Sequence, residues 1–233
     1  MAAVLKPSDF TAVAQQRYNI YTVIHKGLRG FMTDTLHRWG RADMTDDKDR
    51  TTAIAQVRAL LNTCAGHLQH ENDFLHPALE AARSGASAQT AHDHVDHEAA
   101  IAELREQLAV FEAAAAVQRP YMALQFFRRL SVFVAENFEH MIVEETDNHA
   151  VLIGAYSDDE ILAIQHRLVA SLSPEESFTD LRWMIGYANS QERAFLLGGM
   201  KLGAPPPVFQ AVMGLAREVL SPGDFEKLES ALA

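Results

Sequence analysis

The sequence predicts an all-α protein, and two observations carry this prediction. Apolar residues recur with the helical period along almost the whole chain, and runs that alternate apolar and polar residues, as strands do, are absent from the sequence. The long periodic segments are separated by only a few breaker residues, so consecutive helices should run antiparallel. We therefore expect an up-down-up-down antiparallel four-helix bundle with a C-terminal helical extension.

The bundle is expected in residues 1–154. Its four helices should cover about residues 13–39, 49–82, 88–117 and 120–150. The first breaker, GRADMTDDKD, offers several N-cap residues. In the second, RSGAS, Gly85 can take the conformation that ends a helix, and Pro120 suits the first turn of the fourth helix.

The extension, residues 155–233, should consist of shorter helices. SDDE at 157–160 and SPEE at 173–176 read as capping boxes, and the prolines at 205–207 separate two helices. Helices this short need a surface against which to bury their apolar faces. We expect the extension to pack on the outside of the bundle or to join two chains as a homodimer. It holds no His–Glu pair, so we expect it to have no part in metal binding.

Composition excludes several classes of protein. With 48% hydrophobic residues among 233, the chain can bury a sizeable core. Its 20 Lys and Arg against 31 Asp and Glu give a net charge of −11, which argues against nucleic acid and against an anionic membrane as partners. Residues 1–20 lack the pattern of a signal peptide, and the single Cys64 cannot form an internal disulfide. These features favour a cytoplasmic protein.

Histidine and glutamate recur at a spacing that suits metal binding. Residues four apart lie on one face of a helix, so that both side chains can reach one ion. The chain has 11 histidines and 17 glutamates in 233 residues, and chance would give roughly 0.8 such pairs. Four occur: His67/Glu71, His76/Glu80, His94/Glu98 and His140/Glu144. The Glu-x-x-His spacing of ferritin-like proteins does not occur.

One histidine on each long helix lies on an otherwise apolar face. Residues equally far from the loop between two antiparallel helices lie at one height. Three pairs of these residues on consecutive helices meet this condition, because the position midway between the two residues falls inside an expected breaker. The midpoint is 46 for His25 and His67, 84 for Glu71 and His97, and 118.5 for His97 and His140. Buried carboxylates are costly without a compensating cation. The sequence therefore predicts a metal site formed by His25, His67, Glu71, His97, His140 and Glu144.

Other interpretations of these residues stay open. The polar layer could be purely structural, held by hydrogen bonds between histidine and glutamate. His94 is the rival of His97 for the position on the third helix. His70 is either a ligand or an outer partner of one. His76 and Glu80, beside Pro77 near a helix end, are expected to form an exposed pair.

The same residues carry a resemblance to a known family. HLQHE at 67–71 followed by FLHPAL at 74–79 resembles the second-helix motif of the hemerythrin and HHE cation-binding family. IHKGL at 24–28, DHE at 96–98 and FEHMIVEE at 138–145 are similar to its first, third and fourth helices. The resemblance covers about residues 14–150, and the extension is similar to one in some bacterial members.

The resemblance implies two iron ions that share two bridging glutamates and an oxo or hydroxo group, with zinc or manganese as substitutes. Four histidines, two bridging carboxylates and the shared oxygen leave two coordination positions open on an octahedral pair. Hemerythrin proper fills one of them with a fifth histidine on the third helix, where this chain has Ile101 on one side of His97 and Asp93 on the other. Either Asp93 or His94 fills a position, or both positions stay open.

The function that the resemblance implies is a binding module rather than an enzyme. It would be a non-haem di-iron protein that binds or senses dioxygen, nitric oxide or iron. One rival is a di-iron oxidase or peroxidase, for which Tyr21 is the candidate proton donor. The other is an interaction protein in which the metal is structural and the extension is the working surface.

Overall fold

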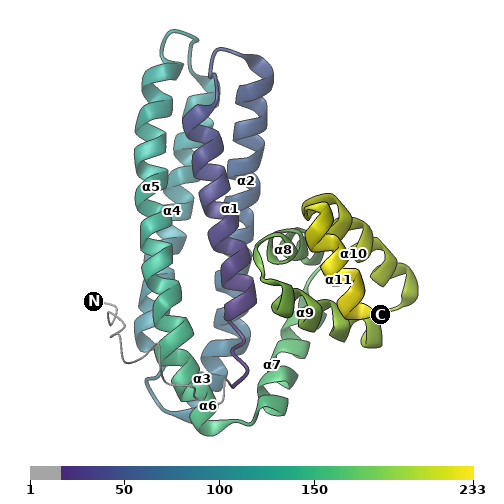
Figure 1. Ribbon diagram of the computed structural model, residues 1–233. Coiled ribbons are helices and arrows are strands. Elements are labelled where there is room, and N and C mark those ends of the chain that lie inside the picture. The colour runs from purple at the N-terminus through teal and green to yellow at the C-terminus, as the bar shows by residue number, and fades with distance from the viewer. Residues whose placement is uncertain (1–16) are drawn as a thin grey trace, which may run out of the picture. The chain divides into compact units, whose positions relative to one another are not determined.

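The computed structural model describes residues 17–233, and this part of the chain contains helices and no strands (Figure 1). The expected all-α class is therefore confirmed for the described residues. The part of the first expected helix at 13–16 lies outside them. The contacts divide the described chain into two compact units, residues 17–21 with 35–171 and residues 22–34 with 172–233, which we describe separately. The expected domain boundary after residue 154 stays a prediction.

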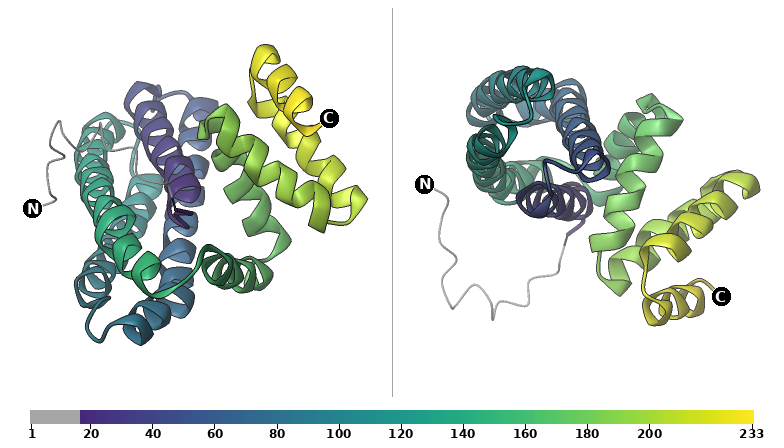
Figure 2. Two further views of the ribbon diagram at one scale, coloured as in Figure 1. Left: turned by 60° about the horizontal axis from the view of Figure 1, so that its bottom comes forward. Right: turned by 90° about the horizontal axis from the view of Figure 1, so that it is seen from above.

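The first unit contains the last third of α1, residues 35–41, and the long helices that follow it. In chain order its elements are α1 (Thr22–Arg41), α2 (Asp47–His70), η2 (Glu71–Leu75), α3 (His76–Ala82), α4 (Ala88–Ala113), α5 (Arg119–Val143), η3 (Glu144–Asn148), α6 (His149–Ala155) and α7 (Asp158–Ser171). Helix α4 packs against both α2 and α5, and the three lie side by side (Figures 1 and 2). The indole Nε1 of Trp39 on α1 donates to the Ala123 carbonyl on α5 at 3.0 Å.

The helices of the first unit are joined at the expected breakers. The Asp46 carboxylate accepts from the backbone N–H of Asp49 at 2.8 Å, which caps the start of α2. Between α3 and α4, Gly85 has a φ of +78°, a conformation that glycine adopts at little cost. The Glu80 carboxylate accepts from the backbone N–H of Gly85 at 2.8 Å and so fixes this turn.

Two helix ends differ from the expectation. Helix α1 begins at Thr22, later than expected, because the Asn19 side chain accepts from the Tyr21 N–H at 3.0 Å and forms a turn before it. Helix α4 ends at Ala113, although the alanines that follow favour a helix. The chain must turn here to reach α5, and the Arg119 side chain donates to the carbonyl of residue 114 at 3.2 Å.

Two helices contain a π-helical turn, a feature that the sequence did not predict. In η2 and η3 the backbone bonds reach five residues back, as from His76 N–H to the Glu71 carbonyl. Such a turn accommodates one extra residue within a helix and is frequent at functional sites. After Glu71 the buried face continues at Leu75 and Leu79, while Phe74 is only partly buried.

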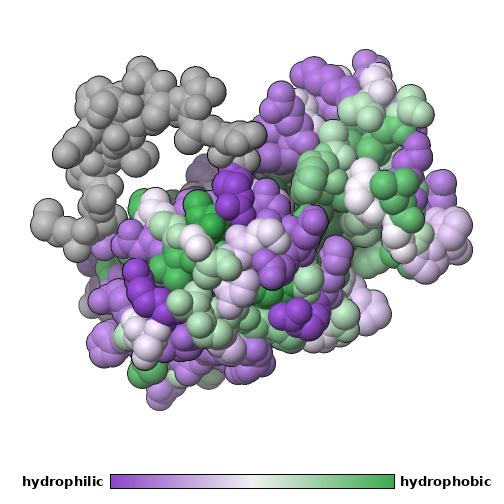
Figure 3. Space-filling view, turned by 90° about the horizontal axis from the view of Figure 1, so that it is seen from below, coloured by the Kyte–Doolittle hydropathy of each residue, from purple (hydrophilic) through white to green (hydrophobic). Residues whose placement is uncertain are grey.

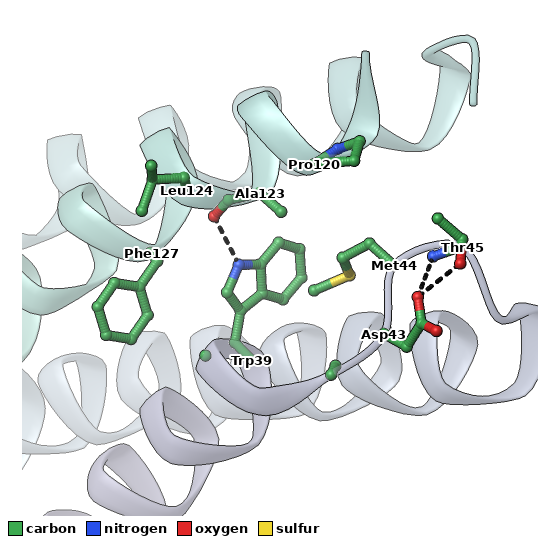
Figure 4. Close-up of a pocket in the computed structure, with 10 residues that line it drawn as sticks. Trp39, Asp43, Met44, Thr45, Pro120, Ala123, Leu124 and Phe127 are labelled. Carbon is green, nitrogen blue, oxygen red and sulfur yellow. Dashed lines mark hydrogen bonds between the residues drawn. The ribbon is translucent and has the colours of Figure 1, made fainter. Parts of the chain in front are cut away.

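The core of the first unit is aliphatic and aromatic. Its fully buried residues include Val57, Leu60, Leu104, Leu108, Phe111, Leu130 and Phe133. A cavity of about 420 Å³ lies beside the α1–α2 connection, with Trp39, Met44 and Phe127 in its lining (Figure 4). The one ionisable residue of that lining, Asp43, accepts a hydrogen bond from the Thr45 N–H at 2.8 Å. A single carboxylate does not make a metal site there.

A second cluster of buried residues attaches α7 to the first unit. Ile161 and Ile164 of α7 pack with Leu79, Leu152 and their neighbours on α3 and α6. The chain just before α1 is attached to the same region, because the Arg17 guanidinium forms an ion pair with Asp158 at 2.7 Å. The segment 158–171, expected in the extension, thus belongs to the first unit by its contacts.

The second unit consists of residues 22–34 of α1 and four shorter helices. These are α8 (Pro174–Tyr187), α9 (Ser190–Gly203), α10 (Pro206–Val219) and α11 (Pro222–Leu232). Their shared core contains Ile185, Leu197, Val212, Ala216, Phe225 and Leu228. The expected capping box at Ser173 and Glu176 is present, and Asn189 with Glu192 forms another that the sequence analysis missed.

The surface mixes polar and apolar side chains. Figure 3 shows hydrophobic residues interspersed with hydrophilic ones over the face seen from below. Within the described part of the chain, no helix combines the length and the apolar character that crossing a membrane requires.

Candidate metal centre

Two overlapping groups of ligand atoms lie inside the first unit. One contains Glu71, His94, His140 and Glu144, all four buried, with one ligand atom from each within 4.8 Å of the others. One ligand atom of His67 and one from each of the same two glutamates also lie within 4.8 Å of one another. Both glutamates therefore belong to both groups.

The distances show how each carboxylate is used. The Oε1 atom of Glu71 lies 3.3 Å from Nε2 of His67, and its Oε2 lies 3.5 Å from Nε2 of His94. The Oε1 atom of Glu144 lies 3.8 Å from Nε2 of His94, and its Oε2 lies 3.3 Å from Nε2 of His140. Each glutamate thus faces one histidine with each oxygen, as a carboxylate bridging two ions does.

Residues outside the cluster fix two of the histidine rings. Nδ1 of His94 lies 2.8 Å from Oδ1 of Asn72, the residue that follows Glu71 in η2. Nδ1 of His140 lies 3.3 Å from a carboxylate oxygen of Asp93. Because both oxygens are acceptors, each ring donates its Nδ1 proton outward. This is the arrangement in which outer partners orient metal-binding histidines.

That arrangement directs unshared electron pairs into the centre. With their Nδ1 atoms turned outward, His94 and His140 direct their Nε2 atoms inward, where either can bind a cation once it gives up its proton, and these two atoms lie only 3.1 Å apart. The carboxylate oxygens of Glu71 and Glu144 face the same space. Acceptors that converge in a buried space repel one another unless a cation or a proton lies between them. The donor set therefore fits a bound metal ion.

Burial and charge shift the pKa values of the neighbouring histidines in opposite directions. Burial lowers the pKa of His140, but the hydrogen bond and the charge of Glu144 outweigh it and raise the pKa above its ordinary value. At His97 burial lowers the pKa to about 4, the nearby His140 and His94 add to the effect, and the charges of Asp93 and Glu144 offset only part of it. His97 is therefore neutral at neutral pH and able to act as a ligand.

A tyrosine hydroxyl lies near the two carboxylates. The side chain of Tyr21 is 1% exposed. Burial raises its pKa well above the ordinary value, and the charges of Glu144 and Glu71 raise it further, against a hydrogen bond with Asn148 that lowers it. The hydroxyl therefore keeps its proton at neutral pH.

The structure corrects the expectation for His76 and Glu80. His76 is buried, its ring stacks on that of His94 at 4.7 Å between centroids, and its Nε2 lies 3.3 Å from Oγ1 of Thr90. Thr90 in turn accepts from the Asn148 side chain at 3.2 Å. The π-helical turn rotates His76 inward, whereas Glu80 stays exposed and caps the turn at Gly85.

The structure brings together four residues of the expected ligand set: His67, Glu71, His140 and Glu144. At the α4 position it places His94 in the cluster. His97 is 5% exposed and lies outside both groups, with its ring 4.9 Å from that of His140. The ligand role of His97 stays a prediction.

The remaining sequence candidates have different positions. Asp93 partners His140 from the outer side and is 24% exposed. His70 is half-buried and lies outside both groups. His25 is fully buried and lies on the first half of α1, within the second compact unit. Its role as a ligand is also still a prediction.

Sequence reasoning missed the two π-helical turns and the role of Asn72. Both turns begin at a cluster glutamate, Glu71 in one helix and Glu144 in the other. The apolar pattern gives no clear signal for either turn, because Leu75 and Leu152 lie four and eight residues after Glu71 and Glu144, spacings that an unbroken α-helix also allows. No signal marks Asn72 either, because an asparagine in a polar helical turn is ordinary.

Comparison with protein families gives one match. The model of the hemerythrin HHE cation binding domain matches residues 17–152, which is more than half of the chain and includes every residue of the two ligand groups. Neither the curated proteins nor the solved structures give a match. The chain thus belongs to the hemerythrin HHE cation binding domain family, and its buried histidines and glutamates are fit to hold a cation.

Proposed function

We propose that the protein binds two metal ions, iron in its working form, in a site bridged by Glu71 and Glu144. The observation that carries this proposal is that each buried glutamate faces two histidines, one with each oxygen. Imidazole and carboxylate together suit iron, manganese and zinc. The bound pair would supply reversible binding of a small ligand such as dioxygen or nitric oxide.

The proposed ligands are His25, His67, Glu71, His94, His140 and Glu144. The contacts of Nε2 of His94 with both carboxylates favour it over His97 at the α4 position. His25 completes the set because its place on the first helix matches the family pattern. The proposal includes the up-down-up-down arrangement of α1, α2, α4 and α5, in which each helix contributes to the site.

The protein's own residues prepare this site in three ways. Asn72 and Asp93 hold the rings of His94 and His140 with Nδ1 outward and Nε2 toward the carboxylates. The surrounding apolar core excludes water, which strengthens every charge interaction inside. The Tyr21 hydroxyl holds a proton beside the two carboxylates. That proton makes an oxidase or peroxidase the second candidate function, tested by peroxide turnover in Tyr21→Phe.

The direct test is metal analysis of the full chain after growth in iron-supplemented medium. We expect about two equivalents of metal in the wild type and in Glu80→Ala. Glu71→Ala and Glu144→Ala should each lose both ions, because a bridging carboxylate offsets charge on both. Equal metal content in the three variants would contradict the assigned bridges. Anaerobic spectra with dioxygen, nitric oxide and peroxide added in turn then identify the ligand.

A further inference from the structure

The chain just before α1 is fixed to the π-helical turn η3. The Asn19 side chain donates to the Glu145 carbonyl within η3 at 3.0 Å and accepts from the Tyr21 N–H, also at 3.0 Å. The Tyr21 ring belongs to the buried cluster that contains Leu79, and all these residues lie in the first unit. Tyr21 therefore has a fixed place beside η3, the turn that begins at the proposed ligand Glu144.

Asn148, the last residue of η3, belongs to a buried hydrogen-bond network in the same unit. Its Nδ2 donates to Oγ1 of Thr90 at 3.2 Å, and the Thr90 hydroxyl donates to the Ser87 carbonyl at 3.2 Å. Nε2 of His76 lies 3.3 Å from the same Oγ1. A hydroxyl has one proton and two lone pairs, so the proton goes to Ser87 and the lone pairs accept from Asn148 and from Nε2–H of His76. All four residues are buried, and the network fixes the Asn148 amide with its nitrogen toward Thr90.

The second N–H of this amide accounts for the hydrogen bond between Asn148 and Tyr21. That bond lowers the pKa of Tyr21, as a bond donated to the phenol oxygen does, because it favours the ionised form. A phenol oxygen that accepts from Asn148 directs its own proton elsewhere. The charges that act on the hydroxyl are those of Glu144 and Glu71, so these carboxylates attract the proton.

We propose that Asn148, fixed by Thr90 and His76, is a positioning residue that turns the Tyr21 hydroxyl toward the two carboxylates, where it donates a hydrogen bond to a small ligand held at the centre. The inference rests on the proposed function and names the class of ligand that the centre prefers. A fixed donor favours a small anion with an electron-rich terminal atom, such as azide, because hydrogen bonds to a charged acceptor are roughly twice as strong as neutral ones.

Azide is the probe for this preference, added to the oxidised, iron-loaded full-length chain. An optical titration gives its dissociation constant. The infrared stretching band of bound azide, recorded in light and in heavy water, shows whether an exchangeable proton is hydrogen-bonded to it. We expect the wild-type band to shift in heavy water. In Tyr21→Phe the shift should be lost and azide should bind at least about tenfold more weakly, the loss of one hydrogen bond to a charged group.

Asn148→Leu and Thr90→Val should give losses of the same kind although Tyr21 is unchanged. Thr35→Val is the matched control for Thr90→Val. Both threonines are 1% exposed, and both accept a hydrogen bond from a side-chain amide at 3.2 Å, which for Thr35 is that of Gln56. The control should bind azide as the wild type does. All these variants should keep about two equivalents of iron, since none of them removes a proposed ligand.

The outcomes separate the two proposals. Asn148→Leu with the wild-type azide affinity, band shift and iron content overturns the inference and leaves the proposed function intact. A band shift that persists in Tyr21→Phe does the same, since the proton then comes from another group. A wild-type chain that binds no metal overturns both proposals.

A measurement on the wild type alone decides the question if the variants do not fold. In the zinc-loaded full-length chain, NMR should show the side-chain amide protons of Asn148 in contact with the Tyr21 ring and with the Thr90 methyl group. The absence of either contact overturns the inference.

Discussion

Replacing Asn72 by leucine should weaken one of the two metal positions without unfolding the protein. Asn72 lies in η2, and its Oδ1 accepts from Nδ1 of His94 at 2.8 Å. Leucine keeps the size of the side chain and removes the acceptor. The His94 ring, only 1% exposed, then has no fixed partner on its outer side. It can take the other tautomer, in which its Nε2 carries the proton and cannot bind metal.

The size of the effect follows from this geometry. Losing the outer partner of a metal-binding histidine typically lowers metal affinity about 10- to 100-fold, which corresponds to about 1.4–2.8 kcal/mol. Because His94 belongs to only one of the two ligand groups, the loss should fall on one equivalent. The free energy of unfolding of the metal-free chain should change less, since the lost contact is a single partly buried hydrogen bond.

Equilibrium dialysis with Fe(II) under anaerobic conditions measures both equivalents in the variant. Asn62→Leu is the matched control, because Asn62 also accepts a hydrogen bond at 2.8 Å, from Arg105 on the protein surface. We expect the control to bind both ions as the wild type does. Wild-type affinity for both ions in Asn72→Leu would refute the argument that Asn72 sets the orientation of His94.

Two further predictions concern other carboxylates. Asp93→Asn should weaken one equivalent by about tenfold, because the amide holds the Nδ1 proton of His140 less strongly than the carboxylate does; Asp96→Asn, at an exposed site, should not change metal content. Asp180 is half-buried, and its partial burial together with the negative charge of Glu176 raises its pKa to about 7. The native state then holds this proton more tightly than the unfolded chain, so stability should fall as the pH rises from about 4 to 7. Asp180→Asn should remove that fall, which urea unfolding at pH 5 and pH 8 measures; an equally steep fall in the variant would contradict the assignment.

Helical spacing is enough to predict the helices and the two His–Glu pairs on α2 and α5. It does not distinguish His94 from His97, because both lie on the buried face of α4. The residue midway between Glu71 and the α4 histidine shifts by only 1.5 positions when His94 replaces His97. That shift is smaller than the length of the loop between α3 and α4. Side-chain contacts decide between them, and the partner that fixes His94 is Asn72, on another helix.

The π-helical turns are less accessible still to sequence reasoning. Their defining bonds join backbone atoms, so no particular side-chain pattern marks them. The inward rotation of His76 depends entirely on such a turn, which is why an exposed pair with Glu80 was the wrong expectation. The burial of Leu75 and Leu79, four and eight residues after Glu71, is consistent with the turn but does not by itself require it.

The turn at Glu71 can be tested by deleting one of its residues. A π-helical turn absorbs one extra residue, so removing the exposed Asp73 should restore an ordinary α-helix. After the deletion, Leu75 and Leu79 follow Glu71 by three and seven residues. These positions lie on the same face of an α-helix as Glu71, so both leucines stay buried. The fold should survive, while the proposed metal ligand Glu71 and its neighbour Asn72 change position.

Deleting Asn62, exposed in the α-helical part of α2, has the opposite expected effect. No extra residue exists there to be absorbed, so every buried residue between Asn62 and the turn rotates off its face. Each buried leucine that is displaced costs about 1.5–3 kcal/mol. By thermal unfolding and metal titration, the Asp73 deletion should stay folded with weakened metal binding, and the Asn62 deletion should lose several kcal/mol of stability. Two deletions that destabilise the chain equally, or an Asp73 deletion that binds both ions normally, would show that the turn does not set the position of Glu71.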